Sequence, residues 1–288
     1  INMLTTLLKP TSGTARVAGF DVVKEPDKVR RSLGLVPQDL TVDEDLTGRE
    51  NIMLQSKLYH VPSDVAKKRV EDVLKLVGLL DAADRKVDTY SGGMRKRLEL
   101  AEGLIHYPKV LFLDEPTLGL DVQTRSVMWQ YIQRLRKERK MTIFVTTHYM
   151  DEADRLCDRI AIIDHGKIVT IGTPYQLKEN LGGDLIDLRL TDGAPDLTQT
   201  LSSIPLIGDV KRNGASYRIR VRKGEEAVPD ILEAIVKMNL EVKSVSLEKP
   251  SLDQVYLEYT GRSLRDDQTR TNSEEAFRRR IQLRRLRS

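Results

Sequence analysis

Cysteine and aromatic residues are scarce in this chain of 288 residues. Cys157 is the only cysteine, which excludes an internal disulfide and a zinc site built from cysteines, and which is typical of a reducing compartment. Aromatic residues make up only 5% of the chain, which argues against a ligand cage of aromatic rings. The remaining composition, with 40% hydrophobic and 31% charged residues, is typical of a globular protein and excludes a disordered or collagen-like one.

Long apolar runs are also absent. No segment approaches the roughly 20 apolar residues that a membrane-spanning helix needs, and the first residues lack the basic and then apolar pattern of a secretion signal. Any membrane role should therefore run through a partner. The net charge of +4 is uneven, because residues 262–288 hold nine arginines against four acidic residues and leave the rest of the chain at −1. We therefore expect the chain to bind no nucleic acid.

Apolar runs and helical spacing predict an α/β fold. Residues 110–113 and 142–145 read as buried strands, and the helix-like segment 122–140 between them predicts a right-handed βαβ unit in a parallel sheet. Apolar residues recur at helical spacing over 45–80, which predicts mostly amphipathic helix. Residues 1–8 are rich in apolar side chains and read as a helix without an N-cap, so we expect a further segment upstream.

The character of the chain changes near residues 180–183. Beyond them, apolar and polar residues alternate over 185–190 and 217–221, and a helical stretch at 228–237 precedes a further strand at 242–247. This order predicts a second, smaller α+β domain, for which the chain is long enough. The predicted parts are a first domain at 1–183, the α+β domain at 184–260 and a poorly ordered basic tail at 261–288.

Two adjacent carboxylates follow the apolar strand 110–113. In an open α/β sheet, ligands bind beyond the carboxyl ends of the strands. Because successive strand side chains point to opposite sides, Asp114 can reach a metal ion on a phosphate group while Glu115 faces an attacking water. An isolated Asp-Glu pair more often marks a solvated strand end. The neighbouring motifs favour a functional site here.

Ser91 begins a segment of good helix formers and is followed by Gly92 and Gly93. A serine N-cap leaves backbone amides and the positive end of the helix open to an anion, so this segment predicts a phosphate site. Taken alone, an ordinary helix cap is the more common explanation. Gln38 and His148 also stand at predicted strand ends, although a single histidine is more often structural or solvent-exposed than functional.

In their order along the chain, these residues resemble the nucleotide-binding subunit of an ABC transporter, and the resemblance extends from residue 1 to about residue 183. It implies a P-loop NTPase-like cassette with a mainly parallel sheet and a helical subdomain. Residues 250–256 and 260–262 are similar to the small C-terminal domain of antibiotic-resistance exporters of the daunorubicin-resistance class. The motifs that carry the cassette resemblance are the Q-loop at 35–38, the LSGGQ signature at 90–94 (here YSGGM), the Walker B strand at 111–115, the D-loop at 119–121 and the H-loop at 147–148.

The resemblance implies ATP and Mg²⁺ as cofactors and assigns roles to the matching residues. It implies that Glu115 and His148 are catalytic. Gln38 and Asp114 would approach Mg²⁺ through the nucleotide. The residues that would bind ATP are Gln38, Ser91, Gly92, Gly93, Asp114 and Asp121.

One motif of the family does not occur in the chain. The Walker A loop, G-x-x-x-x-G-K-[ST], has no match, because the single Gly-Lys pair, Gly166-Lys167, is followed by Ile168 and lacks the earlier glycine. By resemblance the loop should stand directly before Ile1, so the cassette would lack its N-terminal strands and its P-loop. We expect the full-length parent to bind ATP and this polypeptide to bind it poorly.

The resemblance also implies partners and a location. A second ATP-binding subunit would pair head to tail with the first, and a separate membrane-spanning permease would receive the motion and select the cargo for export. The chain would lie at the inner face of the cell membrane. Non-transport ABC ATPases of translation or DNA repair are an alternative, but they typically carry two cassettes or a long coiled coil, and this chain has neither. A non-enzymatic fragment remains open, as does contact of the basic tail with an anionic membrane, for which a solvated end is the simpler alternative.

Overall fold

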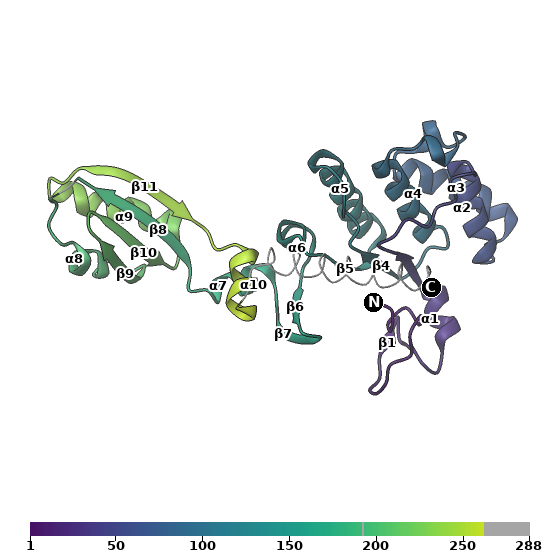
Figure 1. Cartoon of the computed structure of the whole chain (residues 1–288), viewed down its shortest axis with the longest axis horizontal. Coiled ribbons are helices and arrows are strands. Elements are labelled where there is room, and N and C mark those ends of the chain that lie inside the picture. Colours follow the sequence, from purple (N-terminus) through teal and green to yellow (C-terminus); the bar gives the residue numbers. More distant parts are fainter. Residues whose placement is uncertain (192, 262–288) are drawn as a thin grey trace, which may run out of the picture. The chain divides into compact units, whose positions relative to one another are not determined.

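The computed structural model describes residues 1–191 and 193–261 (Figure 1). The chain divides into two compact units, Ile1–Glu152 and Ala153–Ser288. Apart from Gly261, the predicted basic tail lies outside the described residues. Among the residues that the structure describes, no helix is long and apolar enough to cross a membrane.

The N-terminal unit begins with turns, so the helix predicted at residues 1–8 is wrong. The amides of Leu7 and Leu8 both bond to the Asn2 carbonyl, and Thr6 has a φ of +67°, which ends regular helical bonding within two turns. A small hairpin follows, formed by β1 (Arg16–Val17) and β2 (Phe20–Asp21). Helix α1 (Pro26–Ser32) then leads into the sheet.

A parallel sheet forms the centre of this unit. Its order is β3-β4-β5, with β3 at Leu33–Val36, β4 at Val110–Asp114 and β5 at Thr142–Thr146. Helix α5 (Val122–Arg139) joins β4 to β5, which confirms the predicted βαβ connection between neighbouring parallel strands. The middle strand is the most apolar, since Leu111, Phe112 and Leu113 are all buried. Residues that follow β4 therefore stand at the centre of the carboxyl edge of the sheet.

Helices gather beside this sheet (Figure 1). The predicted helical segment 45–80 is confirmed as two helices, α2 (Gly48–Leu58) and α3 (Ser63–Leu76), with a break before Pro62, which disfavours helix in the residue preceding it. Two 3₁₀ turns, η1 (Leu80–Ala82) and η2 (Val87–Thr89), lead to α4 (Gly92–Leu104). A Cβ on Gly34 would lie 2.1 Å from the Gly103 carbonyl oxygen, so α4 packs directly against β3.

The C-terminal unit starts with the end of α6 (Met150–Leu156) and an antiparallel hairpin. The hairpin strands are β6 (Ile160–Asp164) and β7 (Lys167–Gly172), and α7 (Pro174–Glu179) follows them. The next element, β8 (Asp184–Leu190), opens a four-stranded antiparallel sheet. The predicted domain boundary between 183 and 184 stays a prediction.

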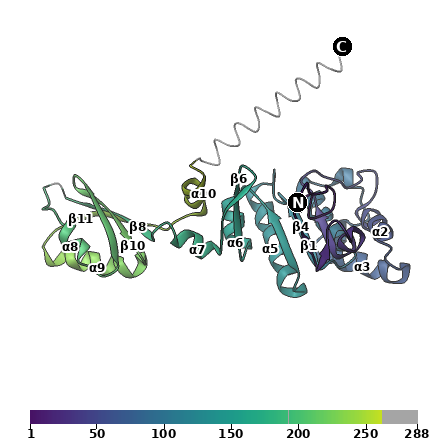
Figure 2. The same cartoon turned by 90° about the horizontal axis from the view of Figure 1, so that it is seen from below.

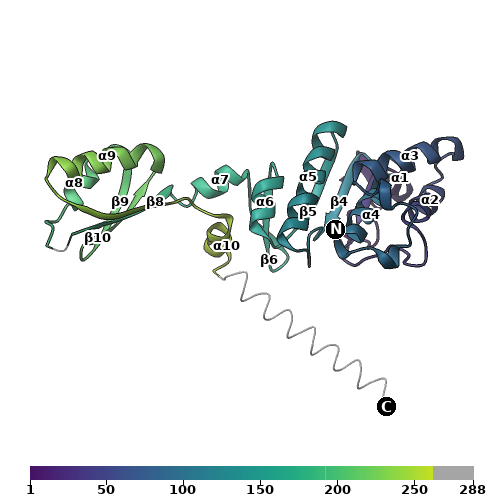
Figure 3. The same cartoon turned by 90° about the horizontal axis from the view of Figure 1, so that it is seen from above.

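This second sheet has the order β11-β8-β10-β9, which is the split βαβ arrangement of a ferredoxin-like α+β fold. Helices α8 and α9 cover one of its faces, as Figure 2 and Figure 3 show, and the buried side chains between them include Ile186, Tyr217 and Ile231. The predicted α+β architecture is thus confirmed. The remaining elements are α8 (Thr198–Ser202), β9 (Ile207–Asn213), β10 (Ser216–Val221), α9 (Gly224–Lys237), β11 (Val242–Glu248) and α10 (Leu252–Thr260).

Candidate functional site

Two acidic side chains stand at the end of the central parallel strand. β4 stops at Asp114, whose carboxylate accepts a hydrogen bond from the Thr146 hydroxyl on β5. Glu115 follows with a φ of +51°, in the left-handed region, and its amide donates to the carbonyl and hydroxyl oxygens of Thr146 at 3.1 and 3.2 Å. Such backbone strain costs about 1–3 kcal/mol and gathers at functional sites. Glu115 lies in a turn beyond the strand. This turn sets the direction of its side chain, and not the alternation of strand side chains that the sequence predicted.

Glu115 and His148 come together from the ends of two neighbouring strands. Nδ1 of His148 lies 2.7 Å from Oε2 of Glu115, with 26% and 20% of the two side chains exposed. The contact lacks hydrogen-bond alignment, so within the described residues Oε2 keeps unsatisfied acceptor capacity. The His148 ring packs on Tyr149 with 4.2 Å between centroids, and the Arg125 guanidinium lies 3.9 Å from the centre of the Tyr149 ring. The sheet therefore joins the two residues that the sequence predicted as catalytic.

Ser91 caps the long helix α4. Its hydroxyl accepts a hydrogen bond from the Met94 amide at 3.3 Å, which confirms the predicted N-cap. Ser91 and Gly92 are exposed, and a Cβ on Gly92 would meet open space. The first amides of α4 and the positive end of its dipole therefore face outward, where they can bind an anion.

The second glycine of the motif, Gly93, is required for a different reason. A Cβ on Gly93 would lie 2.4 Å from Cγ2 of Thr124, so only glycine permits this approach of α4 to α5. Asp121 caps α5, accepting hydrogen bonds from the Thr124 amide at 2.9 Å and from the Thr124 hydroxyl at 2.6 Å. The hydrogen bonds from Thr124 lower the pKa of the Asp121 carboxyl. The predicted signature and D-loop residues thus adjoin each other on one surface.

Gln38 lies just beyond β3, at the same carboxyl edge of the sheet as Asp114. Its side chain is exposed, and its backbone carbonyl accepts a hydrogen bond from Nζ of Lys96 at 3.1 Å. The structure thus connects Gln38 to α4 through its backbone.

A buried carboxylate, which sequence reasoning missed, links the segments around the site. Glu152 on α6 is fully buried, and its Oε1 accepts hydrogen bonds from the Thr117 hydroxyl at 2.9 Å and from Nε1 of Trp129 at 2.8 Å. Thr117 stands two residues after Glu115, and Glu152 stands four residues after His148. Glu152 therefore holds together the chain segments that carry the Glu115–His148 contact. Its sequence signal was weak, because Glu152 stands among three acids at 151, 152 and 154, and residue type alone does not show which of them is buried.

The acids at this edge suit a metal ion that arrives with a ligand. Within the described part of the chain, no group of three or more His, Cys, Asp or Glu side chains is placed to hold a metal ion. Magnesium usually binds to one or two carboxylates and takes its other ligands from phosphate and water. A single aspartate beside a hydroxyl, as at Asp114 and Thr146, fits that pattern.

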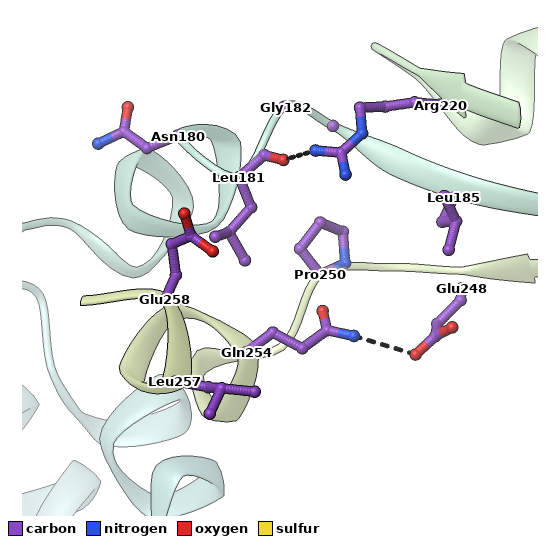
Figure 4. A pocket seen from close by; sticks show the side chains of 11 residues that line it. Asn180, Leu181, Gly182, Leu185, Arg220, Glu248, Pro250, Gln254, Leu257 and Glu258 are labelled. Atoms are coloured by element: carbon purple, nitrogen blue, oxygen red, sulfur yellow. Dashed lines mark hydrogen bonds between the residues drawn. The ribbon is translucent and has the colours of Figure 1, made fainter. Parts of the chain in front are cut away.

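A cavity of about 550 Å³ lies within the C-terminal unit, between the start of β8 and α10 (Figure 4). Arg220 donates to the Leu181 carbonyl at its rim, and Nε2 of Gln254 donates to Glu248 at 3.1 Å. All residues that line it follow residue 179, so it contains none of the predicted site residues.

Comparisons with known proteins match both units. A family model described as ABC transporter matches residues 1–118, and one described as ATP-binding protein DrrA1-3-like, C-terminal domain, matches residues 172–260. The daunorubicin/doxorubicin resistance ATP-binding protein DrrA of Streptomyces peucetius is 41% identical over 96% of this chain and 84% of its own length. The linearmycin resistance ATP-binding protein LnrL of Bacillus subtilis is 35% identical over 92% of this chain and 86% of its own length.

Solved structures of similar fold are ATP-binding cassettes. CbiO1 from Clostridium perfringens, part of the ABC transporter complex cbiONQ, shows 29% identity and a TM-score of 0.57 over 61% of this chain and 72% of its own. The ATP-binding cassette MJ0796, in a dimeric post-hydrolysis state bound to ADP and Pi, shows 27% identity and a TM-score of 0.54 over 60% of this chain and 78% of its own. The predicted fold class, an ABC cassette followed by an α+β domain, is thereby confirmed. The chain belongs to the ABC transporter family, as an ATP-binding protein of the drug-resistance group with a DrrA-like C-terminal domain.

Proposed function

We propose that this chain is the part of an ATP-hydrolysing subunit that energises export through a separate membrane-spanning permease, which holds it at the inner face of the cell membrane, and that it needs a Walker A loop to bind ATP. The observation that carries the proposal is the contact of Glu115 with His148 at the carboxyl edge of the sheet, one residue from Asp114. Family membership and the names of the resistance relatives support it. The permease selects the cargo in this proposal, and the cassette at 1–183 supplies the energy, with a small domain at 184–260 and a basic tail at 261–288.

Each residue at the edge of the sheet has a proposed role. Glu115 orients and polarises the attacking water, for which the partial exposure of its side chain is suited. His148 would contact the γ-phosphate. Asp114 approaches the magnesium ion, and Gln38 responds to the ion and the nucleotide from the end of β3. Mg²⁺, when bound, neutralises charge that develops on the phosphate oxygens.

The signature residues act on a second subunit in this proposal. Two copies pair head to tail, and Ser91, Gly92 and Gly93 of one copy cover the γ-phosphate bound by the other. Asp121 lies at the seam between the copies. The approach of Gly93 to Thr124, within 2.4 Å of a Cβ placed there, supports this arrangement, because it makes the signature and the Asp121 cap parts of one surface.

The experiment uses a loop-bearing form of the protein, in which a Walker A segment from a relative stands before Ile1. In this form Glu115→Gln should lower the rate of ATP hydrolysis by ~10²–10⁴, the usual contribution of a general base. The matched control is Glu138→Gln on the exposed face of α5, where the carboxylate pairs with Arg134, and it should leave the rate unchanged. Near-normal hydrolysis by Glu115→Gln would overturn the proposed role of Glu115.

A further inference from the structure

Helix α4 carries a buried pair of opposite charges outside the motif residues. The side chains of Lys96 and Glu99 are only 7% and 1% exposed, and Nζ of Lys96 lies 3.0 Å from Oε2 of Glu99. Because both charges lose their water, a buried ion pair is seldom more stabilising than apolar side chains of the same size. The pair therefore calls for an explanation other than the stability of the core.

Both charges bind the backbone of the segment that follows β3. Nζ of Lys96 donates to the carbonyls of Pro37 and Gln38 at 2.8 and 3.1 Å. Oε1 of Glu99 accepts from the amide and the hydroxyl of Thr41 at 2.6 and 3.2 Å. The described residues between Val36 and Gly48 form no strand or helix. The bonds to Lys96 and Glu99 therefore satisfy backbone groups that have no hydrogen bonds within a helix or sheet.

Lys96 reaches this backbone through an apolar layer. It lines a small pocket together with Val36, Leu113 and Pro116, in which there is no room for a water molecule. The ammonium group therefore depends on the two loop carbonyls for its hydrogen bonds and on Glu99 for its counter-charge.

We propose that Lys96 and Glu99 are positioning residues, which clamp the segment 37–41 to α4 so that Gln38 and Ser91 move as one body. The inference rests on the proposed function, in which Gln38 serves the nucleotide site of its own subunit and Ser91 serves that of the partner. A clamp between the two lets a change at one nucleotide site reach the other. Neither Lys96 nor Glu99 touches the nucleotide in this proposal.

The clamp itself can be tested in the chain as it stands, by amide hydrogen exchange. Lys96→Met should speed exchange within residues 38–42 by ~10–100-fold at the Thr41 amide, whose bond to Glu99 is held in place by the clamp. Glu99→Leu should do the same at Thr41, whereas Glu99→Gln keeps an acceptor for the Thr41 amide and should have a smaller effect there. The matched control is Lys28→Met, which removes an exposed ion pair with the same three-residue spacing. Unchanged exchange over 38–42 in Lys96→Met would overturn the clamp.

Two further measurements separate positioning from folding. The double variant Lys96→Met with Glu99→Leu leaves no unpaired buried charge, so it should fold even if a single variant does not, and it should still release the segment. Exchange over β4 should stay at its normal rate in every variant that is used. Release of 38–42 only together with β4 would mean general loosening and would contradict the proposal.

Hydrolysis by the loop-bearing form tests the consequence of the clamp. Lys96→Met should lower kcat ~10-fold or more and change KM for ATP less than ~3-fold, because it disturbs coupling and leaves the Walker A contacts in place. The Lys28→Met control should change neither. A normal kcat in a variant whose segment is released would overturn the positioning role. Absence of hydrolysis in the unsubstituted loop-bearing form would instead refute the proposed function, and the exchange data would still decide whether the clamp exists.

Discussion

Replacing Glu102 by glutamine should remove a pH-dependent loss of stability from the N-terminal unit. Glu102 lies on α4 and is only 6% exposed. Burial, together with the nearby carboxylate of Glu99, raises the pKa of Glu102 from its ordinary value of 4.5 to about 8. The folded protein therefore holds this proton more tightly than the unfolded chain does.

The sign and the size of the effect follow from that difference. Since the pKa of Glu102 is higher in the folded protein than in the unfolded chain, the stability that Glu102 contributes is fully present below pH 4.5. This contribution is lost progressively as the pH rises through about 8. At 1.36 kcal/mol for each unit, the loss is about 3 kcal/mol at pH 7 and approaches about 5 kcal/mol at pH 9. Glutamine resembles the protonated acid in shape and does not ionise, so Glu102→Gln should avoid the loss. These amounts are large beside the typical stability of a domain, about 5–15 kcal/mol.

Trp129 makes the measurement specific to the N-terminal unit. It is the only tryptophan in the chain and it is buried on α5, so its fluorescence reports the unfolding of the N-terminal unit. Urea unfolding of both proteins at pH 5, 7 and 9 gives the free energy of unfolding at each pH. The difference between variant and wild type should grow from about 1 kcal/mol or less at pH 5 to the values above. Because the two proteins are compared at the same pH, titrating groups that do not interact with Glu102 cancel.

An exposed acid provides the control. Glu138→Gln on α5 removes a carboxylate that is half exposed and paired with Arg134, and it should show no pH-dependent difference from wild type. A difference for Glu102→Gln that stays constant from pH 5 to pH 9 would refute the raised pKa and the reasoning from burial.

Two further predictions concern the C-terminal unit and nucleotide binding. Tyr217→Phe removes a buried hydroxyl that donates to the Pro195 carbonyl and accepts from the Leu197 amide, both at 3.1 Å, so it should cost about 1–3 kcal/mol, and an unchanged melting temperature of this unit would contradict that. The chain should show no saturable binding of millimolar ATP by calorimetry, because the signature residues cover a phosphate that a Walker A loop must hold, and a stoichiometric heat of binding would contradict this.

Strong local signals made much of the fold predictable. Uninterrupted apolar runs predicted the strands β4 and β5, and helical spacing predicted the helix between them. The N-cap residue Ser91 predicted the start of α4. The ends of neighbouring parallel strands meet at one edge, which agrees with the observed contact between Glu115 after β4 and His148 after β5, whereas the role of His148 was predicted only from the family resemblance.

Features that depend on tertiary contacts were not predictable. Residues 1–8 have helical composition, yet two turns of helix are marginal without packing to support them. The direction of the Glu115 side chain depends on the left-handed backbone of Glu115 itself, and no pattern of residue types predicts that conformation. Lys96 and Glu99 belong to a segment of good helix formers, and their spacing does not reveal that both are buried against a loop more than fifty residues away.

Mixing two inactive variants of the loop-bearing form tests whether the proposed hydrolytic site is built from two copies of the chain. Glu115→Gln should disable hydrolysis through its own water, and Ser91→Arg should disable the site of the partner subunit. A mixed dimer then holds one site with both defects and one with neither. If subunits exchange at random, the mixture should recover about a quarter of the normal rate, since half of the dimers are mixed and each has one intact site. A mixture that remains as inactive as its two components would contradict the account.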